Sequence, residues 1–231
     1  MNNWNKQRIA LLTIILLINL PFASVAIIKQ PQQASTIQSR NHYIALTWGD
    51  ILNVFRRPKK QRGGRGDICL ISPGQPVSST VEEIWSDKPL FTWQLQKGNA
   101  TQIEVSETQW KGKINPGQTN ITYNGTPLQP GQTYTWRLNT VSDFPKKSIL
   151  FQFKLMEPQK RANITNELTK LETKLKRQGA SAEKIAMEKA NYFAQKELWS
   201  DVIQQLYSIS NPSAELKQTI KQIQDSSCKQ N

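Results

Sequence analysis

Hydrophobic residues recur at every second position through the middle of the chain. Alternate positions of a β-strand share one face, so this pattern predicts strands that bury one side. The clearest cases place aromatic residues on alternate positions: Phe91 with Trp93, and Tyr134 with Trp136. We predict strands over residues 80–85, 89–95, 101–107, 132–138 and 148–155. Short strands separated by turns rich in Gly, Pro and Asn are typical of a small antiparallel β-sandwich, which we place at residues 69–157.

Beyond residue 157 the hydrophobic period changes to that of an α-helix. Ile164, Leu168, Leu171 and Leu175 recur three or four positions apart, and Gly179 ends the run. We therefore predict a helical domain over residues 158–231. The fold class is mixed, β first and then α.

Two further hydrophobic series predict an antiparallel helical hairpin of tetratricopeptide type over residues 182–210, with Ser181 as its N-cap. Asn211 and Pro212 are expected to cap and begin a weaker last helix. A helical solenoid needs about three repeats to be stable. This single hairpin must therefore pack on the preceding helix or on the sandwich.

The first 26 residues have the composition of a secretory signal peptide. Lys6 and Arg8 precede a hydrophobic run over residues 9–18, and Ser24 and Ala26 form a small-x-small cleavage site. An uncleaved anchor is the rival interpretation, but the run is shorter than the roughly 20 residues that a spanning helix needs. We expect cleavage after Ala26 and an exported protein, periplasmic or extracellular.

Positive charge is concentrated in the segment that follows, residues 27–68, which we predict to be a disordered basic linker in which residues 48–55 can make one short helical or extended turn. It holds eight Lys and Arg against two Asp, in a chain with 30 basic and 17 acidic residues. Such a segment can attract anionic membrane lipid or wall polymer, and a solvated linker without a ligand is the alternative. Export, and the lack of interleaved aromatic residues, argue against nucleic acid. The candidate polyanion contacts are Arg56, Arg57, Lys59, Lys60, Arg62 and Arg65.

The chain has two cysteines, Cys69 and Cys228. An exported protein meets an oxidising compartment, which permits a disulfide between them. Cys228 lies in a polar tail near the end of the chain, so two unpaired thiols remain the alternative.

Two segments resemble known strand signatures. Pro89-Leu-Phe-Thr-Trp93, followed by the Pro-Gly-Gln-Thr-Tyr-Thr-Trp run that ends at Trp136, looks like the strands of bacterial immunoglobulin/fibronectin-like sandwiches. The helical tail adds Ala190-Asn-Tyr-Phe-Ala194 and Leu198-Trp-Ser-Asp201. With the basic Gly-rich tract before them, these segments resemble an exported cyanobacterial family of unknown function, whose members often accompany caspase-like CHAT proteins.

This resemblance implies a signal peptide, no established activity and no catalytic residues to carry over. It also implies a second family cysteine near the end of the Tyr-x-Trp strand, where this chain has Ser142 beside Asp143. On that pattern Cys69 lacks its usual partner.

The sequence contains no recognisable catalytic or metal-binding motif. Its one histidine, His42, lies in the predicted linker and cannot complete a catalytic triad or a histidine metal site there. Glu82 and Glu83 are adjacent on a predicted strand, so they point to opposite faces. Most aromatic residues occupy strand positions typical of a core, and Trp110 is the one that we expect to be exposed.

We therefore expect a protein with no catalytic residue, cofactor or metal. The favoured function is a protein-interaction or cell-envelope module with an unknown protein partner. The alternative is electrostatic binding of anionic membrane or wall polymer through residues 56–65.

Overall fold

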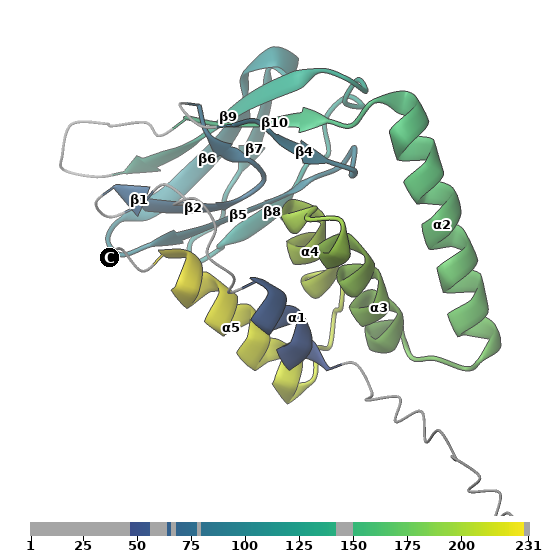
Figure 1. Cartoon of the computed structure of the whole chain (residues 1–231). Helices are drawn as coiled ribbons and strands as arrows, with labels where there is room; N and C mark the ends of the chain where they lie inside the picture. The colour runs from purple at the N-terminus through teal and green to yellow at the C-terminus, as the bar shows by residue number, and fades with distance from the viewer. Residues whose placement is uncertain (1–46, 56–63, 66–67, 78–79, 142–149, 229–231) are drawn as a thin grey trace, which may run out of the picture. The chain divides into compact units, whose positions relative to one another are not determined.

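The computed structural model describes residues 47–55, 64–65, 68–77, 80–141 and 150–228, which all belong to one compact unit, Ile44–Asn231. Most of the strands precede most of the helices (Figure 1), so the predicted β-then-α fold is confirmed. The predicted signal peptide and His42 lie outside the described residues. Within those residues, no helix has the length and hydrophobicity to cross a membrane.

The strands form two sheets. The first sheet has the order β1-β2-β5-β8, and its neighbouring strands are antiparallel. The second has the order β3-β10-β9-β6-β7, and β4 lies parallel to β10. The bounds of the first sheet are β1 Gly64–Arg65, β2 Ile68–Ser72, β5 Leu90–Leu95 and β8 Asn120–Thr122. Those of the second are β3 Gln75–Pro76, β4 Glu82–Ile84, β6 Asn99–Val105, β7 Trp110–Lys113, β9 Thr133–Val141 and β10 Leu150–Leu155. A short 3-10 turn, Ser106–Thr108, joins β6 to β7.

A hydrophobic core fills the space between the two sheets. Phe91, Trp93, Trp136 and Phe153 are at most 1% exposed there, as the alternating pattern predicts. Edge-to-face contacts join Phe91 to Trp136 and to Phe153. The aromatic pattern therefore identifies the inner faces of β5 and β9 correctly.

A tyrosine corner fixes the start of β9. The Tyr134 hydroxyl accepts the backbone N–H of Gln129 at 2.6 Å, which folds the Pro-Gly turn back onto the strand. A Tyr that closes a corner in this way is a hallmark of immunoglobulin-like sandwiches. Gly131, in the turn, has a φ of +82°, which suits a residue without a side chain.

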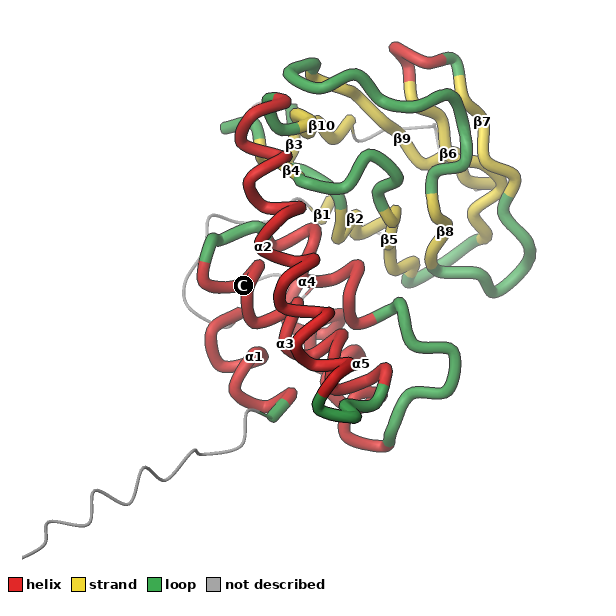
Figure 2. The backbone as a smooth tube through the Cα atoms, turned by 90° about the vertical axis from the view of Figure 1, so that its right-hand side faces the viewer, coloured by secondary structure: helices red, strands yellow, loops and turns green. Residues whose placement is uncertain are grey.

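Strands β2 and β5 of the first sheet are buried on both faces, which the sequence did not indicate. On β2, Leu70 points into the sandwich, while Cys69 and Ile71 pack among the helices. On β5, Leu90 also faces the helices. Figure 2 shows most of the helices gathered on one side of the strands, where α5 contacts β2 and α4 contacts β4 and β5. The helices therefore form a third layer upon the first sheet.

Five helices make up this layer: α1 Trp48–Phe55, α2 Pro158–Arg177, α3 Ala182–Gln195, α4 Trp199–Leu206 and α5 Ala214–Cys228. The predicted hairpin is α3 with α4, and Ser181 caps α3 by accepting the backbone N–H of Lys184. The hairpin packs on α2, as expected, and also on α1 and on β4 and β5.

Helix α1 corrects the prediction that residues 27–68 are a disordered linker. Trp48, Ile51 and Leu52 are at most 4% exposed and belong to the core of the helical layer. The Trp48 indole donates to Glu183 at 2.9 Å, and its backbone N–H donates to Glu215 at 3.0 Å. A helix of eight residues is not stable alone, so these tertiary contacts decide its conformation.

The last helix begins later than the sequence suggested. Ser213, and not Asn211, caps it: the Ser213 hydroxyl accepts the N–H of Leu216 at 3.2 Å. The same hydroxyl donates to Glu183 on α3. This tertiary contact fixes the cap at Ser213.

Candidate functional site

A buried carboxylate joins the helical layer to the sandwich. Asp201, in the first turn of α4, is 2% exposed and accepts the backbone N–H groups of Trp85 and Ser86 at 2.8 and 2.9 Å. Burial raises the pKa of Asp201 to about 7, and the two N–H groups oppose this effect. Nearby, Glu82 raises this pKa further and Arg161 lowers it. Asp201 therefore fixes the turn between β4 and β5 against α4.

Ser200 makes a second link at the same place. Its backbone N–H and hydroxyl both donate to Glu82 of β4, at 3.1 and 2.8 Å. The hydroxyl also accepts the N–H of Gly74 at 3.3 Å. The two consecutive residues Ser200 and Asp201 thus hold three separate sandwich segments.

Helix α2 is attached to the same turn through Arg161. Its Nε donates to the carbonyl of Trp85 at 2.9 Å, and its terminal nitrogen lies 2.8 Å from Asp87. The Trp85 indole donates to Thr165 at 3.1 Å, and its ring contacts that of Phe193 of α3 in a tilted arrangement, with centroids 5.5 Å apart. Trp85 therefore packs with the helices and not in the core between the sheets.

A groove opens beside this junction, between β4, α2 and the turn from α3 to α4. Its volume is about 700 Å³. We call it the junction groove, lined by Glu82, Glu83, Met156, Lys160, Asn163, Ile164, Glu167, Lys196, Glu197 and Leu198. Three of these residues, Met156, Ile164 and Leu198, are hydrophobic and nearly buried, and they form its floor.

The rim of the junction groove is charged. Lys160 pairs with Glu83, and Lys196 lies 3.5 Å from Glu167. Glu167 also accepts the hydroxyl of Tyr192, which lowers its pKa, and Lys196 lowers it further. The adjacent carboxylates of Glu82 and Glu83 take different partners, as opposite strand faces require, yet both line this groove.

A second surface carries positive charge. Lys170, Lys174 and Arg177 lie four and three positions apart on α2, so they share one side of the helix. Together with Thr169, Thr173 and Gln178 they border a shallow depression of about 540 Å³. We call Lys170, Lys174 and Arg177 the α2 cation stripe. The hydrophobic period predicted helix α2, but it did not single out these three cations. Their positions relative to the buried side of the helix show that they lie together on its surface.

The structure says little about the predicted basic tract. Arg56, Arg57, Lys59, Lys60 and Arg62 lie outside the described residues. Arg65 belongs to strand β1, opposite Ile68 of β2. The tract therefore runs between two described elements, α1 and β1, and its ability to bind polyanions stays a prediction.

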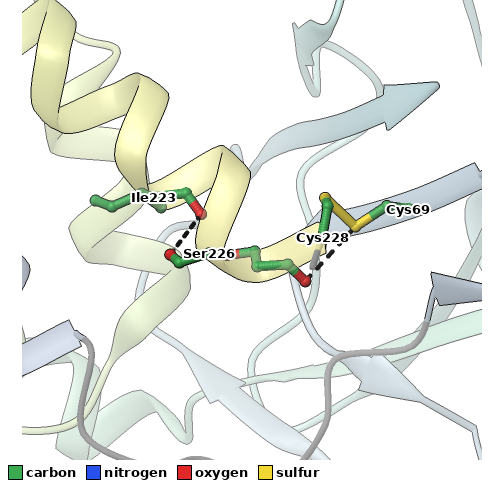
Figure 3. The surroundings of a disulfide bond; sticks show 5 residues. Cys69, Ile223, Ser226 and Cys228 are labelled. Carbon is green, nitrogen blue, oxygen red and sulfur yellow. Dashed lines mark hydrogen bonds between the residues drawn. A yellow bond between two sulfur atoms is a disulfide. The ribbon is translucent and has the colours of Figure 1, made fainter. Parts of the chain in front are cut away.

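The two cysteines are joined in the structure, with Cα atoms 5.7 Å apart (Figure 3). Cys69 can face α5 because it alternates with Leu70, which points into the sandwich. The C-terminal end of α5 reaches Cys228 there, and the Ser227 carbonyl oxygen lies 3.7 Å from the Cys69 sulfur. The bond ties the end of the chain to the first sheet.

Trp110 does not form an exposed platform. Its ring is half-buried and stacks on Phe91 with centroids 5.6 Å apart, and its indole donates to Asn124 at 2.7 Å. A Cβ on Gly112 would lie 2.5 Å from this ring, and one on Gly125 would lie 2.8 Å from it. Trp110 thus occupies a slot that two glycines leave open, which corrects the expectation that it is exposed.

Within the described ranges, no three His, Cys, Asp or Glu side chains are grouped so that they could hold a metal ion. The junction described above combines hydrogen-bonded polar groups with a hydrophobic floor. Such a groove can bind a chain segment.

Comparisons with known proteins bear on the sandwich. Residues 79–149 match the family described as Rha78A-like, N-terminal immunoglobulin domain. No curated protein matches the chain. Among solved structures, the α-L-rhamnosidase from Dictyoglumus thermophilum is similar over 44% of this chain, with 22% identity and a TM-score of 0.27. The match spans 14% of that enzyme's chain.

The matched segment is thus similar to an immunoglobulin-like domain, a kind of module that is typically not catalytic. This agrees with the tyrosine corner and with the two stacked sheets. The predicted relation to an exported cyanobacterial family associated with CHAT proteins stays a prediction.

Proposed function

We propose that this chain is an exported, non-enzymatic protein-interaction module of the cell envelope, and that its contact site is the junction groove. The observation that carries this proposal is the groove itself. Sandwich and helices build it jointly, and Asp201, Ser200 and Arg161 fix its walls through hydrogen bonds.

The chemistry of the groove suits a peptide segment of a partner protein. A hydrophobic floor supplies contact area, and polar groups at the rim supply orientation, which is the usual composition of a binding cleft. A preformed groove loses little entropy on binding, because its walls are already held in place. The similarity of the sandwich to a non-catalytic domain family supports the same interpretation.

Affinity capture from an envelope fraction tests this proposal with two matched variants. Asn163 and Asn166 are both exposed residues of α2, but only Asn163 lines the groove. We expect Asn163→Arg to obstruct the groove and abolish capture of a specific partner, whereas Asn166→Arg retains it. Equal capture by both variants, or no specific partner for the wild type, would count against the proposal.

Electrostatic binding of anionic membrane or wall polymer is the second candidate, and the α2 cation stripe favours it. No described residue forms an ion pair with Lys170, Lys174 or Arg177. Cations near an anionic surface contribute about 1 kcal/mol each.

Sedimentation with anionic liposomes tests this candidate and identifies the surface responsible. One variant replaces the six cations of residues 56–65 with Gln, and the other replaces the three cations of the stripe. Loss of sedimentation in either variant assigns the contact to that surface. Unchanged sedimentation in both variants would eliminate the candidate.

A further inference from the structure

We infer that the junction groove takes a cationic, extended segment of its protein partner, one that places Lys or Arg side chains between hydrophobic ones. This inference rests on the proposed function and adds the chemical class of the partner. Charge is the first argument. The chain as a whole has 30 basic and 17 acidic residues, but the groove is lined by two more carboxylates than ammonium groups.

Both lysines of the groove are already engaged. Lys160 pairs with Glu83. Lys196 lies 3.5 Å from Glu167 and 4.8 Å from the centroid of the Tyr192 ring. Their positive charge is therefore compensated by neighbouring groups, and the net charge of the residues that line the groove is negative.

The carboxylate of Glu197 is an exposed part of this negative charge. Its side chain lines the groove, and no described residue forms a hydrogen bond or an ion pair with its carboxylate. A cation that enters the groove would be the first partner of this group. An exposed ion pair of this kind contributes up to about a fivefold change in affinity.

The backbone at Glu197 is a second, independent argument. Glu197 has a φ of +60°, in the left-handed region that a residue with a Cβ rarely adopts. It follows the end of α3, where the N–H of Glu197 bonds to Ala194 and that of Leu198 bonds to Phe193. Glycine is the usual residue at this position of a helix end, so a Glu here lowers stability. A stability cost at a groove rim is typical of a residue retained for binding.

The hydrophobic floor completes the match. Lys and Arg carry long aliphatic stems that pack on apolar surface while the charged end stays in water. Ile164 and Leu198, 5% and 7% exposed, line the groove together with the carboxylates and offer a small apolar surface to such stems. An acidic or neutral segment could use the floor but not the rim.

Titration with synthetic peptides, followed by NMR of the full mature chain, tests this inference. The peptides have equal length and alternate Leu with Lys, Gln or Glu. We expect the Lys series to bind with saturation and several-fold more tightly than the Gln or Glu series, with shifts at the amides of Glu83 and Glu197. Glu197→Gln should weaken that binding about two- to fivefold. Equal or tighter binding of the Gln or Glu series would overturn the inference.

Glu197→Gly separates binding from folding. Relief of the left-handed strain should raise the midpoint of thermal unfolding by about 2 °C while peptide affinity falls as in Glu197→Gln. Glu188→Gln serves as the matched control, because Glu188 lies on α3 outside the groove and pairs with Lys184. It should leave peptide affinity unchanged, and an equal loss in this control would show that general charge, and not the groove, attracts the peptide.

The two proposals fail in distinguishable ways. If envelope capture finds a partner that Asn163→Arg loses and Glu197→Gln retains fully, the groove binds a protein but the preference for cations is wrong. If capture finds no partner and no peptide series binds, both proposals fall.

Discussion

Asp201 accepts the backbone N–H of Trp85 at 2.8 Å, although 116 positions separate the two residues in the chain. The bond crosses from the first turn of α4 to the turn between β4 and β5. It places a carboxylate, 2% exposed, in the interior between the helices and the sandwich. Stability of the whole unit should therefore depend on the protonation of one side chain.

Asp201→Asn should remove a pH dependence from the free energy of unfolding. The usual pKa of this carboxyl is 3.8 and burial raises it to about 7, so the unfolded chain releases the proton at a lower pH than the folded protein. The Asp201 contribution is therefore fully favourable below pH 3.8 and is lost as the pH rises to about 7. We expect the wild type to lose on the order of 2–4 kcal/mol across this window relative to Asp201→Asn.

Urea unfolding of both proteins at several pH values measures this difference. Glu172 does not interfere, because hydrogen bonds from Lys176 and Lys189 lower its pKa to about 2, and its contribution is lost only as the pH falls below 4.5. Parallel pH profiles for the two proteins would show that Asp201 does not titrate in this way.

Loss of the disulfide should destabilise the protein substantially. Cys69 and Cys228 are 159 positions apart, so the bond constrains most of the unfolded chain. In the chain-entropy description such a loop contributes up to about 5 kcal/mol. Urea unfolding with and without dithiothreitol measures this effect, and a Cys69→Ser/Cys228→Ser double variant is the control that should not respond to reductant. A wild type that does not respond to reductant either would mean that the bond does not contribute.

Tyr134→Phe should lower the free energy of unfolding by about 0.5–1.5 kcal/mol, because the N–H of Gln129 loses its acceptor in a part-buried hydrogen bond. Thr133→Ser, at the neighbouring exposed position, keeps the corner intact and should change little. Chemical denaturation of the two variants beside the wild type checks the prediction. Equal stability of Tyr134→Phe and the wild type would remove the corner from the list of stabilising features.

Gly112→Ala should cost about 1–3 kcal/mol, since its Cβ would lie 2.5 Å from the Trp110 ring. The ring cannot move aside easily because it packs on Phe91 and Tyr123. In a Trp110→Leu background the same substitution should cost less. A double-mutant cycle measures this coupling, and strictly additive effects would argue against the slot.

Much of the sandwich could be predicted because each strand carries its own evidence. Alternation identified the inner faces of β5 and β9, and the turn residues separated the strands. The short strands β1, β2, β3, β7 and β8 were missed, since two to five residues are too few to show a period. Helix α1 was assigned to a linker because nothing local shows that its hydrophobic residues are buried. Only their contacts with the core of the helical layer show it.

The candidate site was harder to predict. Leu198-Trp-Ser-Asp201 was noticed as a resemblance, but nothing local shows that Asp201 is buried or that it binds the turn at Trp85. The sequence predicted that Glu82 and Glu83 point to opposite strand faces, and their different partners, Ser200 and Lys160, agree with this. The groove that both line comes from the packing of α2 beside β4.

By itself, the sequence determined the order of β and α elements, the inward faces of the main strands, and the positions of helices α2, α3 and α4. Hydrophobic period and helix caps determine these features because both act over a few residues. Tertiary structure decided the relations between residues that lie far apart in the chain: the burial of β2 and β5 on both faces, the pairing of Cys69 with Cys228, and the junction at Asp201. These depend on contacts between segments more than a hundred residues apart, whose free energy is gained only when the whole unit folds.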